Sequence, residues 1–244
     1  MTATINGLAE AVAAMERLQG ERPAAALSDA LNHTANQARI ALRAEINNVF
    51  DRPTPFTQNA IRILHAKPKT LAASVFVKDE KDGASKGFAP EDWFKPQVEG
   101  GPRSVKRSEE MLRRAGVLPA NKFVVPGKGA RLDRYGNLSR GHMTQILSGL
   151  MAAEDRAGFS ANATNSRRSK RKGHAQAFFV MRNKAGGAIG IGERRGKSMH
   201  VVLAFVDQPQ YTQRLDFYGV VDRVTDENLD SNLDLAVTKL IENN

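Results

Sequence analysis

A long uninterrupted apolar stripe is the feature that most limits how this chain can fold. Residues 24–50 contain no proline or glycine, and apolar side chains recur there every three or four positions. The stripe consists of Leu27, Leu31, Ala35, Ala38, Leu42, Ile46 and Val49. This spacing predicts one amphipathic helix that ends before the prolines Pro53 and Pro55. Because several stripe residues are small, a second helix can approach closely, from the same subunit or from a neighbouring one.

Shorter patterns predict the remaining elements. Helical spacing of apolar residues recurs in residues 5–18, 139–153, 217–224 and 229–240. Thr225 and Asp226 are placed to cap the last of these helices. Alternation typical of strands recurs in residues 70–78, 175–182, 188–194 and 199–207. Short connections separate the last three strands, which predicts an antiparallel meander.

Two long stretches show neither period. Residues 79–103 and 119–137 are rich in Gly, Pro and Lys, and a basic amphipathic helix is predicted between them. Irregular segments of this length are uncommon in compact domains and are usually functional or become ordered on assembly.

These elements predict an α+β fold. We expect one antiparallel sheet of about four strands, flanked by N-terminal and C-terminal helices and interrupted by long irregular insertions. The whole chain, residues 1–244, is predicted to form a single domain. Its core comprises residues 1–78 and 138–244, and residues 79–137 form an extended loop and helix insertion.

Cysteine is absent from the chain, which excludes disulfides, thiolate metal sites and cysteine nucleophiles. This composition suits a protein made in a reducing cytoplasm. No stretch approaches the ~18 consecutive apolar residues of a membrane span, and Glu10 and Glu16 interrupt the region where a signal peptide would be apolar. We therefore expect neither a membrane span nor a secretory signal.

The charge balance indicates a polyanionic partner. The chain has 36 Lys and Arg against 26 Asp and Glu, a formal net charge of +10. Two segments are especially basic, residues 103–114 and 167–172. Such charge attracts phosphate backbones without regard to sequence. Aromatic side chains are not interleaved with these segments, so we expect no stacking on bases.

The histidines and glycines match no catalytic or nucleotide-binding motif. No two of the five histidines have the i, i+4 spacing of a helical metal site. His33 is interpreted as part of a solvated helix face, and His142 as a helix-start or polar-contact residue. Gly186–Gly192 lacks the third glycine of a dinucleotide fingerprint, so we interpret it as a glycine-rich hairpin.

The acidic residues suggest no reaction either. Glu91 with Asp92, and Glu109 with Glu110, are neighbours in the sequence, and we interpret them as solvated or ion-paired surface carboxylates. The sequence therefore predicts no catalytic residue, no cofactor and no metal site, and a protein that is not an enzyme.

Several stretches together resemble a phage protein family. The N-terminal segments are Gly7-Leu8, Ala11-Val12, Ala25–Leu27, Ala30–Asn32, Thr34-Ala35 and Gln37–Arg39. They resemble the N-terminal region of the minor tail protein Z family of tailed bacteriophages. The central segments are Lys95–Gly101, Gly116–Pro119, Val125–Gly127, Leu132-Asp133, Tyr135–Asn137 and Ser139–Gly141. These are similar to an extension in related phage and prophage virion proteins.

The resemblance implies a tail-completion or neck protein of the virion, assembled in the host cytoplasm. Such a protein forms a homo-oligomeric ring, of six or twelve copies, that joins the head connector to the tail around the DNA channel. Its partners would be other neck, portal-connector or tail proteins and the genomic DNA that passes non-specifically. The candidate residues for the channel or a subunit interface are Arg103, Lys106, Arg107, Arg113, Arg114, Arg167, Arg168, Lys170, Arg171 and Lys172.

Two alternatives remain open at this point. One is a non-specific nucleic-acid-binding protein or small nuclease, in which His142, His174 or Glu91 would act. The other is a tail-tube or baseplate component of the virion.

Overall fold

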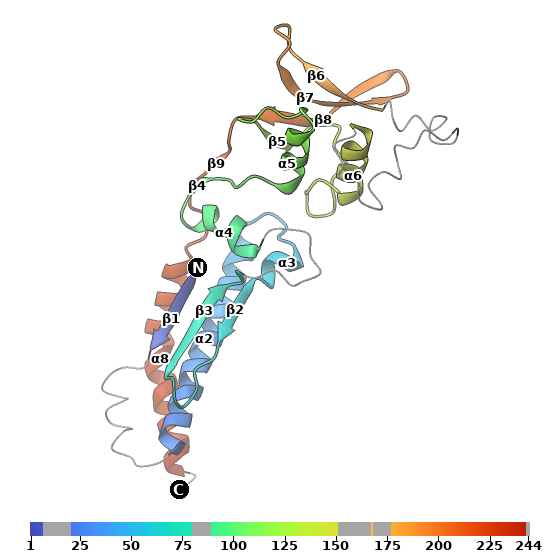
Figure 1. The fold of residues 1–244 in the computed structure, drawn as a ribbon. Helices are drawn as coiled ribbons and strands as arrows, with labels where there is room; N and C mark the ends of the chain where they lie inside the picture. The colour runs from blue at the N-terminus through green and yellow to red at the C-terminus, as the bar shows by residue number, and fades with distance from the viewer. Residues whose placement is uncertain (7–20, 80–88, 151–166, 168–176, 243–244) are drawn as a thin grey trace. The chain divides into compact units, whose positions relative to one another are not determined.

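The computed structural model describes residues 1–6, 21–79, 89–150, 167 and 177–242, and it divides the chain into two compact units (Figure 1). The first unit comprises Met1–Gly101 and Thr212–Asn244, and the second Pro102–Tyr211. The described residues form six helices and three antiparallel sheets. The predicted α+β class is confirmed, with three sheets in place of one.

Two long helices pack along each other in the first unit. Helix α2 (Glu21–Val49) matches the predicted long helix, and its stripe from Leu27 to Ile46 is completely buried. Helix α8 (Phe217–Glu242) packs along it, so the small residues of the stripe do admit a second helix of the same chain.

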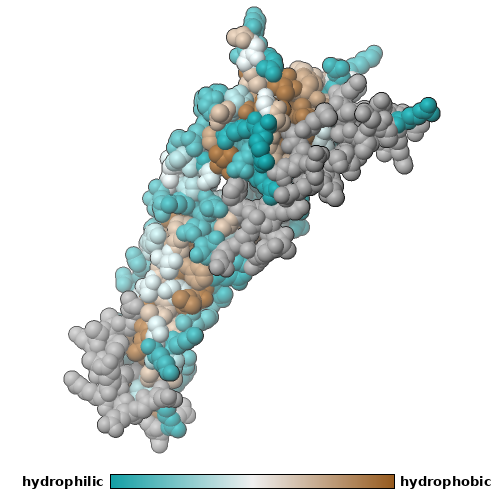
Figure 2. Space-filling model, viewed as in Figure 1, coloured by the Kyte–Doolittle hydropathy of each residue, from teal (hydrophilic) through white to brown (hydrophobic). Residues whose placement is uncertain are grey.

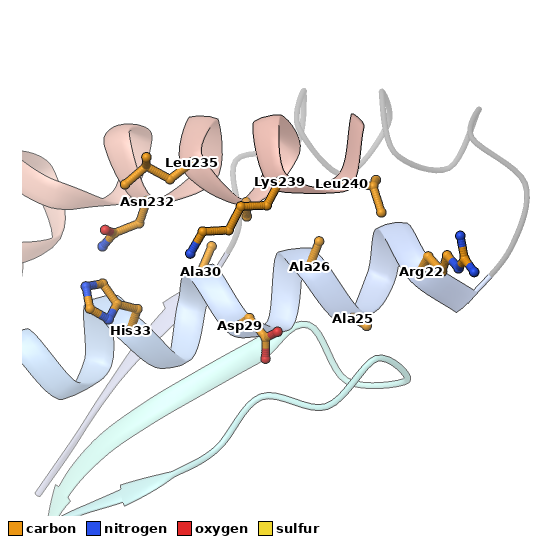
Figure 3. Close-up of a pocket in the computed structure, with 11 residues that line it drawn as sticks. Arg22, Ala25, Ala26, Asp29, Ala30, His33, Asn232, Leu235, Lys239 and Leu240 are labelled. Atoms are coloured by element: carbon orange, nitrogen blue, oxygen red, sulfur yellow. The ribbon is translucent and has the colours of Figure 1, made fainter. Parts of the chain in front are cut away.

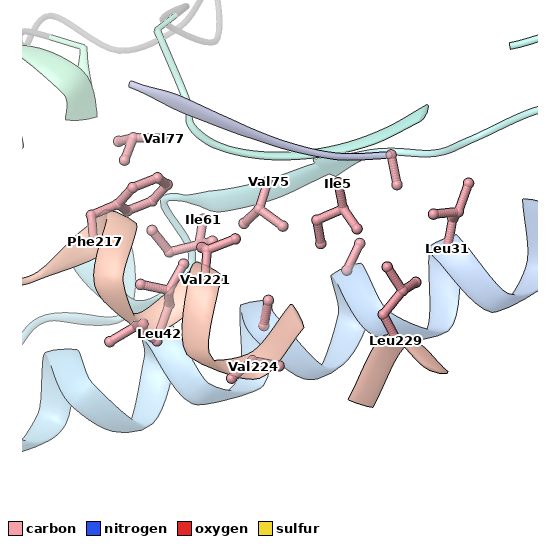
Figure 4. Close-up of a cluster of buried hydrophobic side chains, with 14 of the residues drawn as sticks. Ile5, Leu31, Leu42, Ile61, Val75, Val77, Phe217, Val221, Val224 and Leu229 are labelled. Atoms are coloured by element: carbon pink, nitrogen blue, oxygen red, sulfur yellow. The ribbon is translucent and has the colours of Figure 1, made fainter. Parts of the chain in front are cut away.

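A three-stranded antiparallel sheet lies against these helices. Its strands are β1 (Thr2–Asn6), β2 (Ile61–Leu64) and β3 (Ala72–Val77), in the order β1-β3-β2. Alternate residues such as Ile5 and Val75 face Leu31 of α2 and Val221 of α8, and together they form the core of the unit (Figure 4). The predicted strand 70–78 and its buried face are confirmed.

Two predicted helices of the first unit differ from the structure. Residues 2–6 are a strand paired with β3, so the helix predicted to begin at residue 5 is wrong there, and residues 7–20 lie outside the described part. The two predicted C-terminal helices are one continuous helix. Thr225 is tolerated inside it because its hydroxyl donates to the carbonyl of Val221 at 2.8 Å.

Residues 79–103, predicted to be a loop, contain a short helix. Helix α4 (Pro90–Val98) begins after Ala89, whose backbone N–H donates to the carboxylate of Asp92 at 3.1 Å. Phe94 and Val98 on α4 join the core of the unit. One further turn of helix, α3 (Pro55–Gln58), follows α2 and is capped by Thr54. Proline at the first helical position explains both starts.

The second unit is built on a four-stranded antiparallel sheet of order β5-β8-β7-β6. Its strands are β5 (Phe123–Pro126), β6 (Phe178–Arg182), β7 (Ala188–Arg195) and β8 (Ser198–Val206). The predicted meander is confirmed as β6, β7 and β8. Helices α5 (Arg107–Arg114) and α6 (Arg140–Gly149), both predicted, pack on one face through Leu112, Ile146 and Ile191 (Figure 1).

The boundaries of the predicted insertion differ from those of the units. Residues 102–137 form one unit with residues 138–211, because β5 pairs with β8 and α5 covers the same sheet. The terminal helices flank the three-stranded sheet, which is in the other unit. Strand β4 (Gly101–Pro102) pairs with β9 (Gln210–Tyr211) where the chain passes between the units.

The face of the described residues that Figure 2 draws is largely polar. Figure 2 shows hydrophilic side chains over most of the visible described residues, with apolar side chains in several separate groups. Of the helices in the described part of the chain, none has the length and apolar character to cross a bilayer.

Candidate functional site

The candidate basic residues of α5 and of the segment between β4 and α5 divide into two kinds. Arg103 and Arg113 have packing roles, since both guanidinium groups lie over the ring of Phe123, at 5.0 and 5.1 Å from its centroid. Arg113 also donates to the carbonyl of Lys122 at 2.9 Å. Lys106 and Arg114 are exposed, and Arg107 is half-buried. Two of the five candidate cations of this segment, Arg103 and Arg113, therefore attach β5 to α5 and are not part of the predicted binding surface.

Only one residue of the second basic segment is described. Arg167 is exposed. The remaining candidates, Arg168, Lys170, Arg171 and Lys172, lie outside the described residues.

Glu109 is completely buried, so its interpretation as a surface carboxylate is wrong. It accepts hydrogen bonds from Arg103, from the backbone N–H of Lys106 at 2.7 Å and from that of Val124 at 2.8 Å. Burial alone would raise the pKa of Glu109, but these hydrogen bonds hold it below its ordinary value. The carboxylate thus fastens β5 and the start of α5 to each other.

A second ionic cluster lies between α6 and the four-stranded sheet. Glu193 of β7 is buried and pairs with two arginines, Arg131 and Arg195. Arg195 donates through Nε at 2.9 Å and also reaches the carbonyl of Gly129 at 2.8 Å. Arg131 additionally donates to the side chain of Gln145 at 2.8 Å. Burial alone would raise the pKa of Glu193, but the two arginines hold it below its ordinary value.

His142 completes this cluster from the first turn of α6. Its Nδ1 accepts the backbone N–H of Arg131 at 2.9 Å, which leaves the proton on Nε2, 3.4 Å from Oε2 of Glu193. Burial lowers the pKa of His142, and the charge of Arg131 lowers it further against the opposing effect of Glu193. The imidazole is therefore neutral near pH 7 and is held in a polar contact, as predicted.

Three residues of this cluster, Arg131, Glu193 and Arg195, were not singled out in the sequence. One signal was available. Glu193 occupies the inward position of the alternation that includes Ile191, where an apolar residue is expected. A charge at such a position needs partners, and two arginines supply them.

The remaining predicted residues are placed as follows. His33 is exposed on α2, as predicted. Glu91 pairs with the N-terminal amino group, which fits its interpretation as an ion-paired carboxylate. Gly186 has a φ of +83° in the β6–β7 turn, which confirms a glycine-rich hairpin. His174 lies outside the described residues.

A groove of about 500 Å³ lies between α2 and α8 in the first unit (Figure 3). Alanines and leucines line most of it, among them Ala26, Ala30 and Leu235. Asp29, His33 and Lys239 are also part of its lining. Among the residues that the structure describes, no group of three or more His, Asp or Glu side chains is placed to hold a metal ion.

Charge is divided unequally between the two units. Residues 102–211 contain 21 Lys and Arg against 7 Asp and Glu, a net charge of +14. The remaining residues contain 15 and 19, a net charge of −4. The excess that the whole chain shows thus belongs to one unit.

Comparison with known proteins identifies no relative: no family model, curated protein or solved structure matches the chain.

Proposed function

We propose that the protein is a structural component of a tailed-phage virion, a tail-completion or neck protein. Its copies form a ring that joins the head connector to the tail and surrounds the DNA channel. The observation that carries this proposal is the charge division, +14 on one unit and −4 on the other. A ring subunit around DNA needs a surface that tolerates phosphate and another that contacts protein. The family resemblance supplies the phage context.

The first unit supports assembly into a ring. Strands β1 and β2 are the edges of its sheet, and each pairs with β3 on one side only within the described residues. Unpaired edges and the groove between α2 and α8 are different surfaces of one subunit. Contacts between unlike surfaces generate closed rings when the rotation allows.

Virion imaging tests the proposal. We expect a phage that lacks this protein to produce filled heads and separate tails, and the supplied protein to restore joined particles. Tagged protein should lie at the head–tail junction, with a copy number of six or twelve by quantitative mass spectrometry. Location in the tail tube or baseplate, or absence from purified virions, would contradict the proposal.

The second basic segment provides a sharper version of this test. Serine in place of Arg167, Arg168, Lys170, Arg171 and Lys172 removes five charges. Untailed heads would assign the segment to a subunit contact, and joined particles that deliver DNA slowly would assign it to the channel. We expect untailed heads, because a channel has to let DNA slide and should not hold it tightly. Normal particles with normal delivery would leave the segment as a solvated loop.

A further inference from the structure

One end of the four-stranded sheet carries cations from two distant segments. The β7–β8 connection has only two residues, Gly196 and Lys197, and Gly196 has a φ of +61°. Such a turn places Lys197 at the tip of the hairpin. Arg194 and Arg195 precede it on β7, and both are exposed. Glycine is required at position 196 because an L side chain is strained at this φ.

The second segment is held against the same end of the sheet. Gly127 and Gly129 donate backbone hydrogen bonds to the carbonyls of Val202 and Val201 on β8, at 3.0 and 2.8 Å. A Cβ on Gly127 would lie 2.4 Å from the carbonyl oxygen of Val201, so only glycine allows this approach. Lys128 lies between these glycines and is exposed.

Glu193 holds the arginines of the two segments in place. Its buried carboxylate pairs with Arg131 and Arg195, whose side chains remain 48% and 37% exposed. Fixing both guanidinium groups in the free protein reduces the entropy that a ligand has to remove on binding. The geometry therefore resembles a preformed anion site more than a set of flexible surface charges.

The charge balance of this end is strongly positive. We call Lys128, Arg131, Arg194, Arg195 and Lys197 the basic end of the sheet. Glu193 neutralises one of the five charges, and the neighbouring His142 is neutral. Asp133 and Arg134 follow Arg131 in the chain and carry opposite charges, so they leave the charge balance unchanged. The five cations and Glu193 therefore sum to a net charge of about +4 at this end of the sheet, where Arg194 lies over the ring of Phe179, 5.9 Å from its centroid, on the face of β7 opposite to Arg195.

We propose that the basic end of the sheet binds the phosphate backbone of duplex DNA without sequence preference. Three of its five cations are arginines, whose planar fork matches phosphate oxygens. The inference rests on the proposed function for the identity of the nucleic acid. It assigns the contact to residues that differ from the candidates predicted in residues 103–114 and 167–172.

Two charge-matched double variants of the full chain test the inference. Lys128→Gln with Lys197→Gln removes two cations at the basic end, and neither lysine has a hydrogen bond or ion pair with the described residues. Arg182→Gln with Lys184→Gln removes two cations beside the β6–β7 turn. That turn lies at the other end of the eight-residue strand β7, roughly 25 Å away.

The measurement is fluorescence anisotropy of a 30-base-pair duplex between 50 and 200 mM NaCl. The first variant should bind at least fivefold more weakly than wild type at 100 mM, with a log–log salt slope shallower by about 1 to 2. The second should change affinity by less than twofold. Equal losses in the two variants, or no duplex binding by the wild type at 50 mM, would overturn the inference.

Two further ligands distinguish the class of partner. Polyglutamate or phosphatidylglycerol vesicles that bind as tightly as the duplex would overturn the assignment to nucleic acid. The result is separable from the virion experiment, because DNA binding is measured on the purified chain. Duplex binding at this surface by a protein that is absent from the neck would refute the proposed function and keep this inference.

Discussion

Asn232 of α8 donates a hydrogen bond to the hydroxyl of Thr34 on α2, at 2.9 Å, inside the apolar interface of the two helices. The same amide reaches Oε1 of Gln37 at 2.8 Å, and Thr34 donates in turn to the carbonyl of Ala30 at 3.0 Å. These hydrogen bonds join Asn232 to both Thr34 and Gln37, which fixes the register of α8 on α2.

The first prediction concerns this contact. Thr34→Val leaves the amide of Asn232 without one of its acceptors, and we expect a loss of about 1–3 kcal/mol in the free energy of unfolding. Urea unfolding followed by circular dichroism measures it. Ser231→Ala, an exposed change on the same helix, is the control and should cost less than about 0.5 kcal/mol. Equal effects of the two changes would contradict a role in holding the helices.

Glu109 and Glu110 offer a second comparison, because they are neighbours with opposite environments. Glu109→Gln removes a buried charge from Arg103, and we expect a loss of about 3–5 kcal/mol. Glu110→Gln, at an exposed position, should cost less than about 0.5 kcal/mol. The pKa of Glu109 is lowered in the folded state. Its contribution to the free energy of unfolding is therefore complete above the unfolded-state pKa of about 4.3, and it falls as the pH drops toward the folded-state pKa. Stability of Glu109→Gln should therefore fall less steeply below about pH 4.

His142 gives a third prediction in a higher pH window. Its folded-state pKa is lowered, so the unfolded chain takes up a proton first as the pH falls below about 6.5. Wild-type stability should decline from pH 7 to 5.5, and His142→Gln should flatten that decline while tail joining continues. His33→Gln, at an exposed position, should keep the wild-type slope. Loss of a metal-dependent nucleic-acid cleavage in His142→Gln would instead favour the nuclease alternative.

Two glycines of the second unit give a fourth prediction, because replacing them by alanine should change the stability in opposite directions. A Cβ on Gly190 would lie 2.6 Å from the backbone carbonyl of Leu203, which cannot move without breaking the sheet, so Gly190→Ala should destabilise by about 1–3 kcal/mol. A Cβ on Gly141 of α6 meets nothing within 4 Å. Gly141→Ala should stabilise by about 0.5–1 kcal/mol. Thermal unfolding of the two variants beside wild type measures both shifts. Shifts of the same sign would contradict the inference that the close approach of Gly190 to Leu203 requires glycine.

The fifth prediction concerns the two units. Residues 102–211 contain a complete apolar cluster of their own, and we expect this fragment to fold in isolation with cooperative thermal unfolding. Residues 1–101 alone should remain unfolded, because α8 supplies Phe217, Val221 and Val224 to their core. A single domain, as the sequence predicted, would instead leave both fragments unfolded.

Local patterns in the sequence were sufficient for much of the secondary structure. The stripe of α2, the face of β3 and the meander were all recognisable, because burial on one side imposes a period on the residues. Phe123–Pro126 was missed since four residues without alternating polarity carry no period. Its partner β8 lies some eighty residues later, and pairing at that distance leaves no local mark.

The candidate site was harder to predict for the same reason. Clusters of adjacent cations drew attention to Arg103 and Arg113, yet these two pack on Phe123. The basic end of the sheet combines Lys128 with Lys197, and these are separated by about seventy residues in the sequence. The pairing of Gly127 and Gly129 with β8, and the ion pairs of Glu193 with Arg131 and Arg195, bring the two segments together.

The two ends of the second unit lie beside each other, since the backbone N–H of Arg103 donates to the carbonyl of Pro209 at 3.0 Å. When the two ends of a unit lie beside each other, the DNA that encodes it can be inserted into a gene in one event without disrupting the fold of the surrounding unit. The first unit would then be the older protein. Its strands and long helices would be retained in related proteins that have a different domain, or only a short turn, between residues 101 and 212. Replacement of residues 102–211 by another segment would in this way change the second unit and preserve the fold of the first.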